Sequence, residues 1–163
     1  MASGLVTAYI GLGSNLGDRH KNLEGAVERL SSVGSLTALS SVYETKPWGV
    51  DGYQPRYLNQ VAAVNTILNP LDVVTELLSI EYVLGRAREA KNVSRTLDMD
   101  LLLHGDTVVE ASGVTVPHPR LHERAFVLVP LAQIAADLVH PVFGKSIAEL
   151  TAESDRSGIT GIA

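Results

Sequence analysis

Two carboxylates, Asp98 and Asp100, interrupt an apolar run that begins at Arg95 and ends at Leu103. Side chains of a β-strand alternate between its two faces, so these two carboxylates project the same way. Neighbouring carboxylates that lose hydration repel each other, and a bound cation or a shared proton relieves the repulsion. Two hard oxygen ligands suit Mg²⁺, which takes its remaining ligands from water and substrate phosphates. The alternative, from these residues alone, is a solvated face of an edge strand.

Basic side chains gather around this acidic pair. Four precede it and two follow it: Arg86, Arg88, Lys91 and Arg95, then Arg120 and Arg124. A chain of formal net charge −5 that collects its cations beside two acids is suited to a polyanion held with metal. The net negative charge argues against nucleic acid as the main partner. The alternative is that the basic segment is a solvated loop.

Length and composition indicate one globular domain. The 163 residues fit a single domain over 1–163, with a core at about 5–150 and a loosely held tail from Thr151. The absence of cysteine excludes disulfides, thiolate metal sites and cysteine nucleophiles. No apolar run reaches the ~20 residues of a membrane span, and no basic leader opens the sequence. We therefore expect a cytoplasmic protein without a membrane partner.

Hydrophobic periodicity predicts alternating strands and helices. The expected strands are 5–12, 36–44, 57–68 and the segment around the carboxylates, and the expected helices are 18–32 and 70–84. The order strand, helix, strand, strand, helix, strand is the ferredoxin-like βαββαβ pattern. We therefore predict an α+β fold with a mainly antiparallel sheet, helices packed on its faces, and extra C-terminal strand and helix pieces.

Two local patterns qualify these elements. The glycine-rich stretch 11–18 lacks the spacing of either phosphate-binding fingerprint, which favours a tight strand-to-helix turn over a phosphate loop. Glu81 stands near the C-terminal end of the second helix, against the preference of the helix dipole, which indicates another partner for its carboxylate. The apolar residues expected to be buried on that helix are Leu71, Val74, Leu77 and Leu78.

Six motifs occur in one order along the chain, and together they cover about residues 6–150. They are Gly-Ser-Asn-Leu-Gly at 13–17, Tyr43-x-Thr45-x-Pro47-x-Gly49, Tyr57-Leu58-Asn59, Glu81-(x)4-Arg86-x-Arg88, Arg95-Thr96-Leu97-Asp98-x-Asp100 and Val116-Pro117-His118-(x)5-Arg124-x-Phe126. In this combination the sequence resembles the 6-hydroxymethyl-7,8-dihydropterin pyrophosphokinase family of folate biosynthesis. The Arg-Thr-Leu-Asp-x-Asp and Val-Pro-His motifs are the most specific.

The resemblance implies an enzyme that moves the β,γ-pyrophosphoryl group of ATP onto the hydroxymethyl oxygen of the pterin and releases AMP. It implies ATP as co-substrate and two Mg²⁺ ions held by Asp98 and Asp100. The catalytic positions that it implies are Arg86, Arg95, Asp98 and Asp100. The implied ATP contacts are Glu81, Arg88, Arg95, Leu101, Thr115, His118 and Arg124.

The resemblance also assigns the pterin site. Tyr57 and Phe126 match an aromatic pair that sandwiches the flat ring, and stacking buries both faces of such a heterocycle. The residues implied to contact the pterin are Thr45, Pro47, Trp48, Tyr57, Asn59, Asp98 and Phe126. A buried polar edge that pairs fully with its ligand rejects analogues that lack those groups. We expect the chain to act as a monomer.

The chain departs from the family pattern just before Arg95, where Asn92-Val93-Ser94 stands in place of a common Trp-Gly-Pro. This departure bears on how the basic loop closes over the site rather than on the reaction. Two rival functions stay open on the same fold: another Mg²⁺-dependent phosphoryl-transfer enzyme, and a non-catalytic module that binds small molecules.

Overall fold

The computed structural model describes residues 4–45, 56–86 and 96–162, and for Arg86 and Ile162 it describes the backbone only. The strands are β1 (Val6–Ser14), β2 (Ser35–Leu39), β3 (Val42–Thr45), β4 (Tyr57–Thr66), β5 (Asp98–His104), β6 (Val109–Ala111), β7 (Val114–Val116) and β8 (Ile159–Ile162). The helices are α1 (Arg19–Arg29), α2 (Pro70–Glu81), α3 (Ala125–Ala135) and α4 (Ile147–Glu153). No helix among these residues is both long and apolar enough to cross a membrane.

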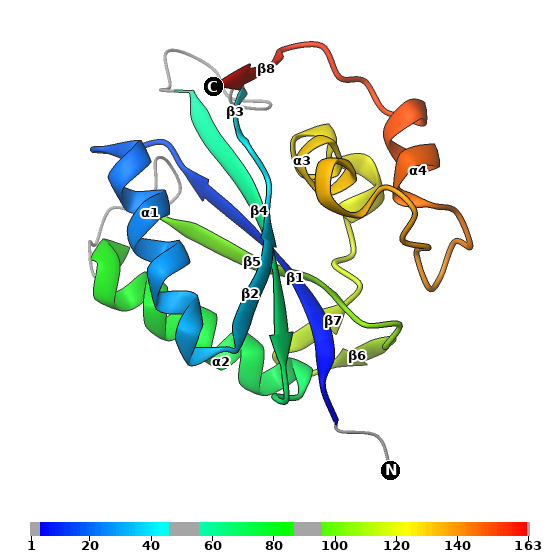
Figure 1. Cartoon of the computed structure of the whole chain (residues 1–163), viewed down its shortest axis with the longest axis horizontal. Coiled ribbons are helices and arrows are strands. Elements are labelled where there is room, and N and C mark those ends of the chain that lie inside the picture. The colour runs from blue at the N-terminus through cyan, green and yellow to red at the C-terminus, as the bar shows by residue number, and fades with distance from the viewer. Residues whose placement is uncertain (1–3, 46–55, 87–95, 163) are drawn as a thin grey trace.

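Most of the strands form one antiparallel sheet in the order β5-β1-β4-β3-β8, with β2 also paired to β4. The strands β6 and β7 form a separate pair. Helices α1 and α2 cover one face of the large sheet, and α3 and α4 lie against the other (Figure 1). This chain order and strand order confirm the predicted ferredoxin-like α+β fold.

Each face of the sheet carries its own apolar core. The core under α1 and α2 includes Ile10, Leu23, Leu58, Leu77, Met99 and Leu101. The core under α3 and α4 includes Val61, Leu102, Leu103, Leu128, Leu131 and Ile147. A register shift between Tyr9 and Ile10 pairs Tyr9 with Leu103 and Ile10 with Leu101. The irregularity explains why strict alternation fails along β5, since both Leu102 and Leu103 belong to the second core.

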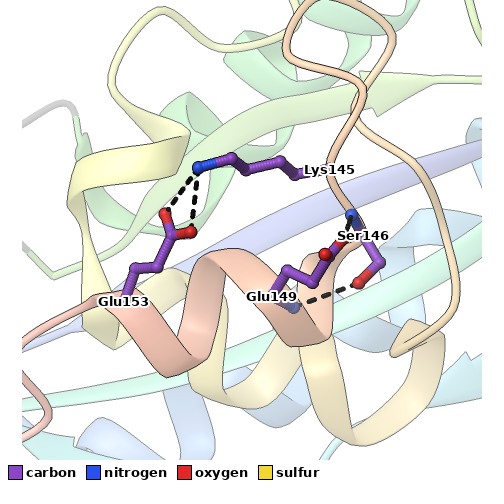
Figure 2. Close-up of polar contacts among 4 residues, drawn as sticks. All are labelled: Lys145, Ser146, Glu149 and Glu153. Carbon is purple, nitrogen blue, oxygen red and sulfur yellow. Dashed lines mark hydrogen bonds and ion pairs between the residues drawn. The ribbon is translucent and has the colours of Figure 1, made fainter.

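Side chains cap the starts of α1, α2 and α4. The side chain of Asp18 accepts a hydrogen bond from Lys21 N at 3.1 Å and caps α1, which confirms the strand-to-helix turn after β1. Asn69 caps α2 in the same way, with Pro70 at the first helical position. α4 begins with a capping box between Ser146 and Glu149, and Figure 2 shows this box beside the Lys145–Glu153 ion pair.

Three expectations about the elements are wrong. The predicted strand 36–44 is two strands, because the chain leaves the ladder at Ser40, where Ser40 Oγ accepts from Val61 N at 2.9 Å. The buried stripe of α2 is Val73, Leu77 and Ile80, whereas Leu71 and Leu78 are about half exposed. The tail from Thr151, which was expected to be loosely held, contains the end of α4 and the strand β8, and β8 pairs with β3 over four residues.

Candidate active site

Asp98 and Asp100 are the first and third residues of β5, at one edge of the sheet. Both are half-buried, whereas Met99 between them is buried in the core under α1 and α2. The carboxylates therefore project from the same side of the sheet, as predicted, toward the layer of α3. Their partners on β1 are Gly13 and Gly11. At the two positions opposite the carboxylates, β1 thus places no side chain on the face from which they project.

Gly13 lies between the carboxylate strand and β4. It pairs with Asp98 on one side and with Asn59 on the other. A Cβ atom at Gly13 would lie 3.4 Å from Asn59 Oδ1 and 3.6 Å from Tyr57 Cδ1. Any larger side chain would project across the gap between these groups and Asp98. The glycine therefore keeps the face open between the acidic pair and the polar end of β4.

The polar end of β4 joins β3 through a buried hydrogen bond. Asn59 Nδ2 donates to Thr45 Oγ1 at 2.8 Å, and the two residues are 7% and 5% exposed. Tyr57 is half-buried and pairs with Thr45 across the strands. Side chains of directly paired residues share a face, so this group faces the same way as the carboxylates. We call the surface formed by Asp98, Asp100, Gly13, Asn59, Thr45 and Tyr57 the carboxylate face.

A turn before α3 supplies cations and an aromatic ring near this face. The backbone N–H of His118 donates to Leu102 O at 2.9 Å, which ties the turn to β5. Arg124 leads into α3, and its guanidinium carbon lies 5.7 Å from the centroid of the Phe126 ring. Phe126 packs against the core under α3 and α4, on the side of the carboxylate face. The structure therefore places these three predicted residues on the side of the sheet from which the two acids project, and His118 is close enough to Asp98 to be affected by its charge.

The surroundings of the His118 ring favour its neutral form. Burial lowers the pKa of His118 from its ordinary value of 6.5, and the charge of Arg124 lowers it further, while Asp98 acts in the opposite direction. The Nδ1 atom accepts a hydrogen bond from Arg120 N at 3.1 Å. A neutral imidazole whose Nδ1 is an acceptor carries its proton on Nε2. His118 can therefore donate one hydrogen bond without gaining a charge.

The Gly-Ser-Asn-Leu-Gly segment holds the start of the carboxylate strand. Ser14 Oγ donates to Thr96 O at 2.5 Å, and Asn22 Nδ2 donates to the same carbonyl at 3.1 Å. Asn22 Nδ2 also donates to Leu16 O at 2.9 Å. These contacts fix the backbone two residues before Asp98. Ser14 and Asn22 cannot be recognised as supports of the site from the sequence, because their partner is a backbone carbonyl far along the chain.

Glu81 lies under the carboxylate strand and is 3% exposed. Its Oε2 accepts a hydrogen bond at 2.7 Å from the backbone N–H of Met99, the residue between the two acids. This is the additional partner that its position in α2 indicated. The contact gives Glu81 a structural role beside the ATP contact implied by resemblance, since it sets the backbone from which both carboxylates project.

We expect Glu81→Ala to destabilise the fold by about 1–3 kcal/mol, because the buried Met99 N–H loses its acceptor. Thermal unfolding measures this loss, with Glu24→Ala on the exposed side of α1 as the matched control. Affinity for a non-hydrolysable ATP analogue is measured on both variants. Unchanged stability together with lost nucleotide affinity would contradict the structural role.

Other predicted residues lie apart from the carboxylate face or outside the described residues. Leu101 belongs to the core under α1 and α2, on the opposite face of β5, and Thr115 is exposed on β7. The ATP contacts implied for Leu101 and Thr115 therefore stay predictions. The predictions for Pro47, Trp48, Arg88 and Arg95 lie outside the described residues, as does the one for the Arg86 side chain.

The donor set on β5 suits a hard divalent cation. Two half-buried carboxylates project side by side, and the paired residues on β1 are glycines. No group of three or more His, Cys, Asp or Glu side chains arranged for metal binding occurs among the residues that the structure describes. Two carboxylates without further protein ligands fit Mg²⁺ better than Zn²⁺, since Mg²⁺ keeps waters and binds substrate phosphates.

Known structures contain the same fold. The chain of wild-type Plasmodium falciparum HPPK-DHPS matches with a TM-score of 0.74 and 13% sequence identity, over 91% of this chain and 44% of that chain. The HPPK-DHPS in complex with substrates matches with a TM-score of 0.70 and 14% identity. This chain thus spans less than half of those proteins, and at such low identity the match supports the fold alone.

Sequence comparisons are more specific. The 2-amino-4-hydroxy-6-hydroxymethyldihydropteridine pyrophosphokinase of Methylorubrum extorquens is 43% identical over 157 residues, 95% of this chain and 98% of the relative. The protein of the same name from Haemophilus influenzae is 43% identical over 139 residues, 84% of this chain and 86% of the relative. A family model of 7,8-dihydro-6-hydroxymethylpterin-pyrophosphokinase matches residues 9–136. The chain therefore belongs to the 7,8-dihydro-6-hydroxymethylpterin-pyrophosphokinase family.

Proposed function

We propose that the carboxylate face is where this chain carries out the pyrophosphoryl transfer of its family. The reaction moves pyrophosphate from ATP to the hydroxymethyl group of 6-hydroxymethyl-7,8-dihydropterin, in folate biosynthesis, and family membership supports it. One observation carries the proposal for the site. Asp98 and Asp100 share a sheet face with Asn59 and Thr45. Only β1 lies between β5 and β4, and its residues opposite the two acids are Gly13 and Gly11.

Asp98 and Asp100 would hold two Mg²⁺ ions. When bound, the ions would neutralise the phosphate oxygens on which charge develops as the hydroxymethyl oxygen attacks the β-phosphorus. The bond between the α-phosphorus bridging oxygen and the β-phosphorus breaks, and AMP leaves with that oxygen. We offer as a hypothesis that one Asp carboxylate on this face accepts the hydroxyl proton as the general base.

The remaining charge on the triphosphate would be met by donors of the turn before α3 and by the basic segment. His118 Nε2–H and the Arg124 guanidinium would donate to phosphate oxygens, which their position in the turn before α3 supports. Arg86, Arg88 and Arg95 would close over the same phosphates from the segment between α2 and β5. Fixed donors aimed at developing charge stabilise a transition state more than they stabilise the bound substrate.

The pterin would lie at the polar end of β4. Asn59 and Thr45 offer a buried amide and hydroxyl to the hydrogen-bonding edge of the ring, together with Pro47 and Trp48 from the loop after β3. Tyr57 and Phe126 would stack on the two faces of the ring. Because β1 presents Gly13 here, the hydroxymethyl group can extend from the pterin site toward the carboxylates.

The proposal is tested by incubating the protein with ATP, Mg²⁺ and the hydroxymethyl pterin and identifying the nucleotide product. We expect AMP in step with pterin pyrophosphate, and no turnover in EDTA. ADP as the product would indicate another phosphoryl-transfer enzyme. Binding of the pterin without consumption of ATP would indicate a non-catalytic binding module.

We expect His118→Ala to weaken binding of a non-hydrolysable ATP analogue about tenfold, the contribution of one hydrogen bond to a charged group. Because the pKa of His118 is lowered from 6.5, the neutral ring predominates at pH 7 and above, so the wild-type to variant ratio of Kd should be the same at pH 7 and pH 8. Isothermal titration calorimetry measures both ratios. A ratio that grows as the pH falls would mean that the imidazolium form makes the contact.

We propose a monomer as the active species. We propose the cytoplasm as the location, because the reaction consumes ATP. Measuring the molar mass in solution at the protein concentration of the activity assay tests the first statement.

A further inference from the structure

The strand β8 pairs along the whole length of β3. Its register joins Val42 to Ile162 at one end and Thr45 to Ile159 at the other. On its other side β3 pairs with β4 over three residues, from Tyr43 to Thr45. A strand of four residues that lay at the edge of a sheet would be held by that second ladder alone. β8 therefore turns the strand that carries Thr45 from an edge strand into an interior one.

The end of β3 is the part that matters for the pterin site. Thr45 is the last residue of β3, and its hydroxyl accepts the buried hydrogen bond from Asn59. Ile159, the first residue of β8, is opposite Thr45. A ladder that reaches this residue restrains fraying of the strand end, and so keeps the hydroxyl at hydrogen-bonding distance from the amide.

The path of the chain from α4 to β8 explains how this strand reaches β3. Ile147 and Leu150 anchor α4 in the core under α3, and the Lys145–Glu153 pair and the capping box of Figure 2 define its ends. From α4 the chain returns to the edge of the sheet beside β3 (Figure 1). Gly158 precedes β8 with a φ of 81°, a conformation that favours glycine.

This strand lies outside the part of the chain that matches the family model, which ends at residue 136. The nucleotide half of the proposed site is remote from it in the sheet. β5, with both acids, is at one end of the strand order, and β8 is at the other. A change in β8 should therefore act on the pterin half of the site while leaving the nucleotide half intact.

We propose that β8 is a positioning element for the pterin, and this inference rests on the proposed function. β8 holds β3 so that the Thr45 hydroxyl and the Asn59 amide are in place before the ligand arrives. A preorganised pair of polar groups spares the ligand the cost of ordering the strand. β8 itself touches no reacting group, so its effect is on pterin affinity and on KM rather than on the chemical step.

The test removes residues 158–163 and compares two affinities in the same protein. We expect the Kd and the KM for the pterin to rise about tenfold, whereas the Kd for a non-hydrolysable ATP analogue stays within about twofold. The kcat at saturating pterin should stay near that of the wild type, because the carboxylates are unchanged. Thr160→Val is the matched control, since it keeps the backbone ladder and should bind both ligands normally.

A second variant keeps the full chain length. Thr160→Pro combined with Gly161→Pro removes two consecutive backbone N–H groups, and one of them faces β3 because successive N–H groups point to opposite sides of a strand. If the shortened chain fails to fold, this full-length double variant takes its place and should show the same loss of pterin affinity. Unchanged pterin affinity in the folded variants, or an equal loss of affinity for the pterin and for the ATP analogue, would overturn the inference. A wild-type protein that fails to bind the pterin would instead overturn the proposed function.

Discussion

We expect Asp98→Asn and Asp100→Asn each to lower pyrophosphoryl transfer by at least about a thousandfold, the scale on which loss of a main electrostatic stabiliser acts. Asn keeps the size of the side chain but removes the charge that a divalent cation requires. The two carboxylates are half-buried on one side of β5. Water therefore cannot take the place of a lost carboxylate as a metal ligand in the same geometry. The measurement is AMP formation at saturating ATP, Mg²⁺ and pterin.

The fold should survive both substitutions. Removing one of two neighbouring negative charges relieves repulsion, so the thermal unfolding temperature should stay the same or rise. Asp106→Asn is the matched control, because Asp106 is an exposed acid that follows the same strand. It should retain full turnover. Near-normal turnover in both β5 variants would refute the assignment of these residues to the metal ions.

We expect Asn59→Ala to raise the Kd for the pterin about tenfold to hundredfold, because it removes a predicted ligand contact and leaves the Thr45 hydroxyl without the amide. Affinity for a non-hydrolysable ATP analogue should change little, since the nucleotide contacts lie on β5 and in the turn before α3. Fluorescence titration of the pterin and calorimetry of the nucleotide analogue measure the two affinities.

The same strand contains a matched control for this variant. Asn65 lies on the same face of β4, and its side chain accepts from Thr7 Oγ1 at 2.9 Å, so Asn65→Ala also breaks an Asn–Thr contact. It does so near the other end of the strand, away from the predicted pterin. Both variants should lose similar stability, but only Asn59→Ala should lose pterin affinity. Equal pterin affinity in the two variants would place the ring elsewhere.

The second helix illustrates where local pattern is insufficient. Apolar residues occur on several sides of α2, and the pattern favoured a stripe containing Leu71 and Leu78. In the structure the helix buries Val73, Leu77 and Ile80, and Leu78 is 51% exposed. The sheet surface against which a helix packs sets the rotation of the helix about its axis. Hydrophobic periodicity alone does not specify that rotation when apolar residues surround the helix.

Two sets of hydrogen bonds that hold the carboxylate strand could not be predicted from the local sequence pattern. Glu81 could be recognised as misplaced in a helix, but its partner, the Met99 N–H, depends on α2 lying under β5. The bonds from Ser14 and Asn22 to Thr96 O likewise join segments far apart in the chain. The sequence of β8 shows only a short and weak hydrophobic alternation. It forms a strand because β3 presents an unpaired edge to it.

The order of strands and helices and the common direction of Asp98 and Asp100 could be predicted from the sequence, because they depend on neighbours along the chain and on the two-residue period of a strand. The motif order also determined the family. Tertiary structure alone decided that glycines separate the acids from Asn59 and Thr45, and that β8 supports β3. Those arrangements depend on the register between distant strands, which packing of the complete sheet selects.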